Sequence, residues 1–260
     1  MQTQYNQDYN NKVVLVGHYG GDKTHALSAW QSTGFDDIYE DLIDSPYNES
    51  YIDQLFENTK SQKKKSVEEL LLFLAKNNHH TPFEKSTLHF QVRSDTATHI
   101  QFLKHRIGVS INTESARYKE LEDKFYLPCD WMEFDGLMLD LTDFVDNPLE
   151  KVEGDIITVL TWFAELGHEL YHRACKELTP IVGRQRAKET SRYFLPYCKQ
   201  VDFDVMFNFR SFMHFQTLRN SKHAQKEIKY IAEKMLYLVS TIKGNPFDLS
   251  LKAFNVNIKE

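Results

Sequence analysis

The sequence predicts an α+β fold in a single domain with more helices than strands. Hydrophobic residues make up 41% of the 260 residues, which is enough for a sizeable core. Two short segments alternate apolar and polar side chains, as half-buried strands do. Several longer segments begin with residues that cap helices, and no internal repeat or low-complexity linker separates them.

One strand and one helix are predicted in the first part of the chain. An apolar run over 13–17, followed by a Gly-Gly pair, predicts a short buried strand. The polar composition of 45–65 predicts a loop. Ser66 and Glu69 match a capping box, so a helix is expected from there to about Asn77.

A second strand and helix are predicted next. Apolar and polar side chains alternate over 88–93, which indicates a half-buried strand. Asp95 can cap a helix that runs through Ile107, with Gly108 as its stop. The segment over 104–118 would then lie across a helix end and the loop after it.

Helices dominate the prediction for the rest of the chain. Residues 130–146 are acidic and irregular, which predicts a surface excursion. Asn-Pro and Thr-Pro pairs favour the start of helices over 147–177 and 179–195. An alternating run over 201–205 predicts a strand. Two further helices are expected over 208–218 and 221–244, capped by Asn208 and Ser221.

Composition excludes several classes of protein. A formal net charge of −6 argues against general nucleic-acid binding, which needs a basic surface. No apolar run approaches the roughly 20 residues of a membrane span. Three sparse cysteines argue against a disulfide framework and predict a reducing cytoplasm, that of the host if the protein is viral.

Residues 104–118, here called the signature segment, read KHRIGVSINTESARY. Four cationic or imidazole side chains stand in this part of an acidic chain. Arginine presents a planar fork of donors that fits phosphate or an ionised ring edge. Ser, Thr and Asn add neutral hydrogen bonds that fix orientation. This mixture suits a nucleotide better than an inorganic anion.

The signature segment resembles that of the flavin-dependent thymidylate synthases: Arg-His-Arg, seven residues, Ser, a small residue, Arg and Tyr. The matching residues are His105, Arg106, Ser115, Ala116, Arg117 and Tyr118.

Two departures from the family pattern stand out. Lys104 replaces the usual Arg, and eight residues rather than seven follow Arg106 before the serine. The extra residue falls between Arg106 and Ser110. It remains open whether Thr113 or Glu114 takes the part of the family's acidic residue.

Three more stretches resemble motifs of the same family, in the same order. Residues 79–84 match His-x-Thr-Pro-Phe-Glu, and 192–196 match Arg-x-x-Leu-Pro. Residues 208–228 match Asn-x-Arg-Ser and then Leu-Arg, three residues, His-Ala-Gln-x-Glu-Ile. The resemblance covers roughly 66–128 and 180–240, so the first 65 residues are weakly matched.

The resemblance implies a single domain over 1–260 with a central, mostly antiparallel sheet flanked by long helices. It implies reductive methylation of dUMP to dTMP, with methylenetetrahydrofolate and NADPH as co-substrates and FAD relaying the hydride. No cysteine lies in the matched motifs, which fits a route without a cysteine nucleophile. A homotetramer with shared active sites is also implied.

The resemblance also assigns site residues. Arg219 would be catalytic, stabilising negative charge on the uracil edge. The residues implied to hold dUMP, with two of the arginines on its phosphate, are Gln101, Lys104, Thr113, Glu114, Ser115, Ala116, Arg117, Arg192 and Arg219. Those implied to contact FAD are Thr81, Lys104, His105, Arg106, Asn112, Glu114, Asn208, Arg210 and His214. For His223, helix packing and ligand contact are equally favoured.

A competing motif is His168-Glu169-Leu170-Tyr171-His172, which reads H-E-x-x-H as in zinc metallopeptidases. The helical pattern places Thr161 and Glu165 on one polar face with both histidines. A polar helix face is therefore preferred, and no metal is expected. A third alternative is a nucleotide-binding homologue without turnover, if Lys104 and the inserted residue disable the site.

Overall fold

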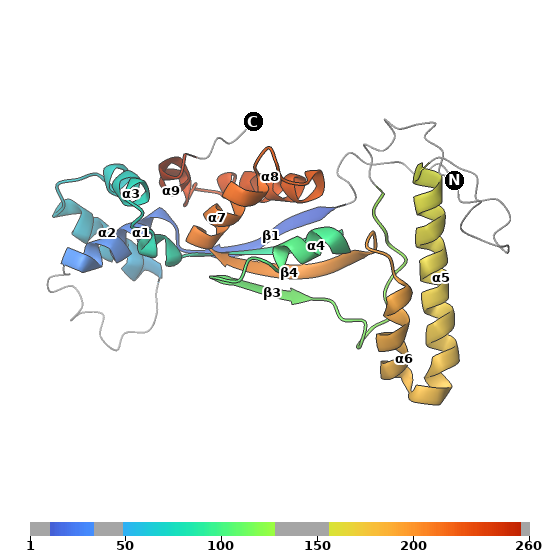
Figure 1. The fold of residues 1–260 in the computed structure, drawn as a ribbon. Helices are drawn as coiled ribbons and strands as arrows, with labels where there is room; N and C mark the ends of the chain where they lie inside the picture. The colour runs from blue at the N-terminus through green and yellow to red at the C-terminus, as the bar shows by residue number, and fades with distance from the viewer. Residues whose placement is uncertain (1–10, 34–48, 128–155, 256–260) are drawn as a thin grey trace. The chain divides into compact units, whose positions relative to one another are not determined.

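The computed structural model describes residues 11–33, 49–127 and 156–255 (Figure 1). These residues form the α+β fold that the sequence predicts, with nine α-helices and one four-stranded sheet. The strands pair in the order β1-β2-β4-β3. They are β1 (Lys12–Tyr19), β2 (Thr87–Asp95), β3 (Val109–Thr113) and β4 (Gln200–Asn208).

The contacts of β4 show that it runs antiparallel to both of its neighbours. On the β3 side, the N–H of Asn208 donates to the carbonyl of Gly108, and the N–H of Glu114 donates to that of Asp202. Residue numbers therefore rise along one strand as they fall along the other. The β2 side shows the same reversal, since His89 contacts Asp204 and the N–H of Thr96 donates to the carbonyl of Lys199.

The chain divides into two compact units. Among the described residues, the first unit contains 11–12, 92–104, 112–127 and 156–203, and the second contains 13–33, 49–91, 105–111 and 204–255. All four strands of this sheet contribute residues to both units. The prediction of a single domain stays a prediction.

Phenylalanine side chains fill the core of the second unit. Phe90, Phe207, Phe212 and Phe215 are fully buried and lie in ring contact with one another. Each such burial stabilises the fold by about 1.5–3 kcal/mol. The helices of this unit are α1 (Asp22–Trp30), α2 (Glu49–Ser61), α3 (Val67–Lys76), α7 (Phe209–Arg219), α8 (Lys226–Ser240) and α9 (Asp248–Ala253), with the 3-10 turns η1 (Gln31–Thr33) and η3 (Thr81–Glu84).

The first unit contains α4 (Thr96–Phe102), α5 (Ile156–Val182), α6 (Arg184–Ser191) and the 3-10 turn η6 (Arg192–Phe194). Helix α5 packs against α6 and η6. A buried cluster of Ala116, Leu121, Tyr171 and Cys175 holds the end of the signature segment against α5. The N–H of Leu121 donates to the hydroxyl of Tyr171 at 3.1 Å, so this attachment is polar as well as apolar.

Several predicted elements are confirmed. Ser66 forms the capping box with Glu69 at the start of α3. The side chains of Asp95 and Asn208 cap α4 and α7. The alternating strands are present as β2 and β4. Within the described helices, none is long and apolar enough to cross a membrane.

Two predictions in the first half of the chain are wrong. The expected loop over 45–65 contains helix α2, whose buried Leu55, Phe56 and Thr59 follow helical spacing within a polar stretch. Strand β1 lies at the edge of the sheet, with Val14 and Val16 more than half exposed, so it is not the buried strand expected.

The helix expected through Ile107 ends at Phe102, and 109–113 form strand β3. Gly108 lies in the turn before β3 and does not stop a helix. Residues 109–113, expected in the loop after the helix, instead pair with β4.

Helix boundaries in the second half also differ from the prediction. Pro180 lies inside α5 and does not start a helix; the break comes at Gly183, whose φ is +80°. The last long helix begins at Lys226, after Gln225 and not after Ser221, and a further helix, α9, follows it. The predicted excursion over 130–146 and the expected start of a helix at 147–148 lie outside the described residues.

Candidate functional site

The residues that the sequence assigns to the site belong to both units, and each group is described by itself. The second unit holds Thr81, His105, Arg106, Asn208, Arg210, His214 and Arg219. The first unit holds Gln101, Lys104, Asn112, Thr113, Glu114, Ser115, Ala116, Arg117 and Arg192.

In the second unit, the part of the signature segment over 105–108 is fastened to the N-terminus of α7. The hydroxyl of Ser211 donates to the carbonyl of Ile107 at 2.6 Å. The N–H of Asn208 donates to the carbonyl of Gly108 at 2.9 Å. Asn208 also caps α7 by accepting from the N–H of Ser211 at 2.8 Å. One asparagine and one serine of the Asn-x-Arg-Ser motif therefore fix both the helix start and the turn.

Gly108 is required by the geometry of this turn. Its φ is +63°, in the left-handed region that side chains disfavour. A Cβ at this position would lie 2.2 Å from Nδ2 of Asn208 and 2.6 Å from Oγ of Ser211. The turn lies within 106–110, the stretch in which the extra residue is expected.

At the other end of α7, Arg219 contacts His105. Its Nε–H donates to Nε2 of His105 at 3.0 Å. Burial, followed by the charges of Arg219 and His214, lowers the pKa of His105 to about 4. The imidazole is therefore neutral at pH 7 and its Nε2 accepts a hydrogen bond. Burial also lowers the pKa of Arg219, which nevertheless stays charged.

An ion pair joins two further motifs in this unit. Arg210 of α7 pairs with Glu84, the last residue of η3. Thr81, at the start of η3, is exposed, as are Arg106 and His214. The second unit thus presents cations and exposed hydrogen-bonding groups from three of the predicted motifs.

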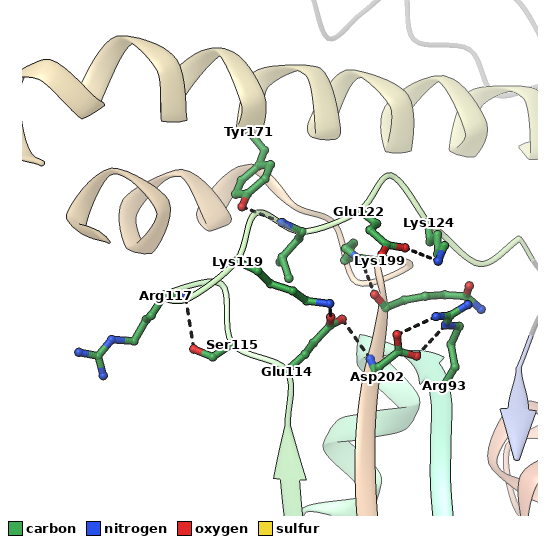
Figure 2. A network of polar contacts seen from close by, with 12 residues as sticks. Arg93, Glu114, Ser115, Arg117, Lys119, Glu122, Lys124, Tyr171, Lys199 and Asp202 are labelled. Carbon is green, nitrogen blue, oxygen red and sulfur yellow. Dashed lines mark hydrogen bonds and ion pairs between the residues drawn. The ribbon is translucent and has the colours of Figure 1, made fainter. Parts of the chain in front are cut away.

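In the first unit, the two candidates for the family's acidic residue have different partners. The hydroxyl of Thr113 is 2.8 Å from Nε2 of His99. Glu114 accepts from the N–H of Asp202 at 3.0 Å through one oxygen and pairs with Lys119 at 2.6 Å through the other. Figure 2 shows the Glu114 carboxylate between these two partners. Glu114, the only carboxylate of the two candidates, therefore connects the end of β3 to β4.

Asp202 and Arg93 extend this network. The guanidinium of Arg93 donates to both oxygens of Asp202 at 2.7 Å (Figure 2). Hydrogen bonding by Arg93 lowers the pKa of Asp202, so the carboxylate is charged at pH 7. Lys199 lies nearby, buried, and donates to the carbonyl of Gln200. The sequence did not assign these residues to the site, because Arg93 and Asp202 stand at the polar positions of alternating strands, where a polar side chain is expected.

The predicted phosphate ligand Arg117 is half exposed and has an acidic partner. Its Nε lies 2.7 Å from Glu189 of α6, a contact that the sequence did not suggest. Its backbone N–H donates to the hydroxyl of Ser115 at 3.3 Å. Arg192 is exposed, at the start of η6, and lies over the ring of Tyr193. Arg117 is thus oriented before any ligand is considered.

The H-E-x-x-H motif on α5 has structural contacts. His168 is buried, with Nδ1 2.7 Å from the carbonyl of Ala164, so its placement on a polar face is wrong. The buried face instead follows Val159, Ala164, Gly167, His168, Tyr171 and Cys175. His172 has both ring nitrogens 2.7 Å from carboxylates, those of Glu120 and Asp123. Among the described residues, no group of three or more His, Cys, Asp or Glu could hold a metal ion.

Known proteins are similar to this chain in sequence. The family described as "Thymidylate synthase complementing protein" matches residues 15–243. A flavin-dependent thymidylate synthase of Thermosipho melanesiensis is 31% identical over 166 residues, which cover 64% of this chain and 68% of that protein. One from Streptomyces avermitilis is 28% identical over 254 residues, covering 94% and 91%.

A solved structure has the same fold. The UMP/dUMP methylase PolB from Streptomyces cacaoi, bound with 5-Br dUMP, superposes with a TM-score of 0.66 at 24% identity and covers 95% of both chains. This likeness confirms the predicted fold class.

Proposed function

The chain belongs to the family of the thymidylate synthase complementing proteins, and from this premise we propose that it is a flavin-dependent thymidylate synthase. It would methylate dUMP to dTMP with methylenetetrahydrofolate as the one-carbon donor and NADPH as the reductant. The observation that carries the proposal is the Arg219–His105 contact. It brings together two residues from separate matched motifs and leaves a half-buried cation in a defined orientation.

The chemistry of dUMP methylation explains why a cation is needed. Carbon 5 of uracil is a poor nucleophile, so the ring must become electron-rich before it attacks the one-carbon donor. A guanidinium held against the ring edge stabilises the negative charge that develops there. We assign this catalytic role to Arg219, because it is half-buried and its charge is weakly screened there.

The remaining predicted residues would bind and orient the nucleotide. Arg117 and Arg192 would hold the phosphate, since both are exposed arginines whose forks suit phosphate oxygens. Gln101, Ser115 and Ala116 would contact the sugar and base. Lys104 and Thr113 also remain assigned to this site, as does Glu114, whose carboxylate the network in Figure 2 holds in place.

The residues assigned to FAD fit such a group. Arg106 and Arg210 supply cations, and Thr81 and His214 supply exposed polar groups, a set that suits phosphates and the polar edge of a flavin. Asn208 is also assigned to this site. Lys104, His105, Asn112 and Glu114 complete the assignment. When bound, FAD supplies the hydride chemistry that no amino-acid side chain provides.

The proposal extends to assembly and location. We propose a homotetramer in which subunits share active sites, located in the cytoplasm. Exposed aromatic side chains of the first unit, such as Tyr118, Tyr193 and Tyr197, are at least two-thirds exposed and support an interface between copies.

The direct test is synthesis of dTMP by the purified protein supplied with FAD, NADPH, methylenetetrahydrofolate and dUMP. We expect dTMP that depends on FAD, and equal turnover when Cys129, Cys175 and Cys198 are all replaced by Ser. UMP should be assayed in parallel, because the solved relative is named for both nucleotides. Nucleotide binding without product from either substrate would contradict the proposal and favour a homologue without turnover.

A further inference from the structure

We propose that His105 is a positioning residue for Arg219, acting as the hydrogen-bond acceptor that fixes the direction of its guanidinium. The catalytic consequence rests on the proposed function, whereas the contact itself does not. The resemblance assigns His105 to the flavin alone, so this role is an addition.

The first support is the identity of the Arg219 atom that donates to His105. It donates to His105 through Nε, the nitrogen inside the side chain, at 3.0 Å. A guanidinium is planar and rigid, so fixing Nε also fixes the plane and direction of the two terminal nitrogens. Those terminal nitrogens form the fork that can face an anionic ring edge. The contact with His105 therefore orients the fork of Arg219.

The second support is the way the segment over 105–108 is held. It runs along α7 in the opposite direction to the helix: His105 contacts Arg219 at the C-terminus, and Ile107 accepts from Ser211 at the N-terminus. The ring of Phe215, one turn before Arg219, lies edge-on to His105 at 5.1 Å between ring centres. The imidazole is therefore fixed by backbone contacts and by packing before it accepts from Arg219.

The third support is the protonation of His105. Nε2 accepts only if it carries no proton, and burial favours the neutral ring. The neighbouring charges of Arg219 and His214 act in the same direction. The proton of the neutral ring then belongs on Nδ1.

The test compares two substitutions of similar size. In H105Q, the side-chain oxygen can reach the place of Nε2 and still accept from Arg219. In H105L, packing against Phe215 is kept but the acceptor is lost. H18L is the matched control, since His18 lies on β1 and belongs to no assigned site.

The contact is read first in the protein without substrates, by nitrogen-15 NMR. We expect a wild-type His105 ring protonated on Nδ1, and an Arg219 Nε–H that exchanges slowly with water. R219K identifies that signal. Slow exchange should persist in H105Q and H18L and be lost in H105L. A His105 ring protonated on Nε2 would overturn the proposal. So would an Arg219 Nε–H that exchanges with water at the same rate in wild type and H105L.

The catalytic effect of losing the contact is measured as the kcat of dTMP synthesis. H105L should lower kcat by about 10²-fold, the order expected when a catalytic group is misplaced by about 1 Å. H105Q should restore at least a tenth of wild-type kcat, with the Kd for dUMP little changed in both variants. Equal kcat in H105L and wild type would overturn the positioning role. If H105L fails to fold, two measurements still test the contact. They are the protonation of the His105 ring in wild type and the exchange rate of the Arg219 Nε–H in H105Q. No dTMP from wild type, with the NMR pattern intact, would refute the proposed function and leave the contact standing.

Discussion

Arg210 of α7 forms an ion pair with Glu84 of η3, although 126 residues separate them in the chain. Each belongs to a different matched motif, so the pair joins the Thr-Pro-Phe-Glu and Asn-x-Arg-Ser motifs in one place. Both side chains are partly exposed, and such a pair contributes only about 0–1 kcal/mol to stability. Its effect is to orient the Arg210 fork.

Replacement of Glu84 by Gln should therefore weaken flavin binding without destabilising the protein. The Arg210 guanidinium loses its charged partner and the orientation that partner gives. D53N is the matched control, because Asp53 pairs with Lys23 on the surface outside the assigned site. Thermal unfolding should change little in either variant, while the Kd for FAD should rise only in E84Q. An equal Kd in E84Q and wild type would remove Glu84 from the site.

Replacement of Arg219 by Ala should abolish methylation and leave the fold intact. Removal of one preorganised donor to a developing charge typically costs about 10²–10³-fold in kcat. Arg219 lies at the end of α7 and is not part of the buried core, so circular dichroism and the unfolding midpoint should stay close to wild type. Turnover by R219A at the wild-type rate would refute the catalytic assignment.

Replacement of Gly108 by Ala should destabilise the protein more than the same change at Gly183. Both residues have positive φ, so each alanine incurs backbone strain of about 1–3 kcal/mol. At Gly108 the new Cβ would also meet Asn208 and Ser211. At Gly183 nothing lies within 4 Å of it. Urea denaturation of both variants measures the difference, and equal losses would show that the turn against α7 is not tight.

His172 should make stability depend on pH. Burial lowers its pKa, but hydrogen bonds from the ring to Asp123 and Glu120 outweigh that effect and leave the pKa raised above its usual 6.5. A raised pKa means that the charged ring stabilises the fold fully below the unfolded value and loses this effect as pH rises through the folded value. The free energy of unfolding should therefore fall across that interval in wild type.

The control for this pH effect removes the carboxylates and keeps the histidine. Both H172Q and the double variant E120Q/D123N should lack the decrease in the free energy of unfolding that wild type shows as pH rises above 6.5, measured by urea denaturation. A wild-type decrease that persists in H172Q would assign it to another group.

The elements that the sequence predicted correctly carry local signals. The caps at Ser66, Asp95 and Asn208 depend on residues within one helical turn. The alternation in β2 and β4 depends on neighbours two positions apart. In each case the side chain and its partner lie close in the sequence, so pattern alone is sufficient.

The elements that the sequence did not predict depend on partners far away in the chain. Strand β3 forms because 109–113 pair with β4, about 90 residues later in the chain. Helix α2 depends on burying Leu55 and Phe56, which are sparse in a polar stretch. Neither signal is strong enough locally to compete with a turn or a loop.

The site shows the same limit. Motif spacing named the residues, including His105 and Arg219, but not the contact between them. It also missed Glu189, which pairs with Arg117, and Asp202, whose backbone N–H binds Glu114 across 88 positions. Such partners are set by sheet pairing and helix packing, which no local pattern encodes.

The visible absorption spectrum of the protein tests most directly the proposal that the protein binds both flavin and dUMP. We expect a bound-flavin spectrum on adding FAD and a further shift on adding dUMP. In R117A the dUMP titration should shift to weaker affinity by about 1.5–3 kcal/mol, the value of a lost hydrogen bond to a charged group. A spectrum that stays that of free FAD, with no response to dUMP, would contradict the proposed function.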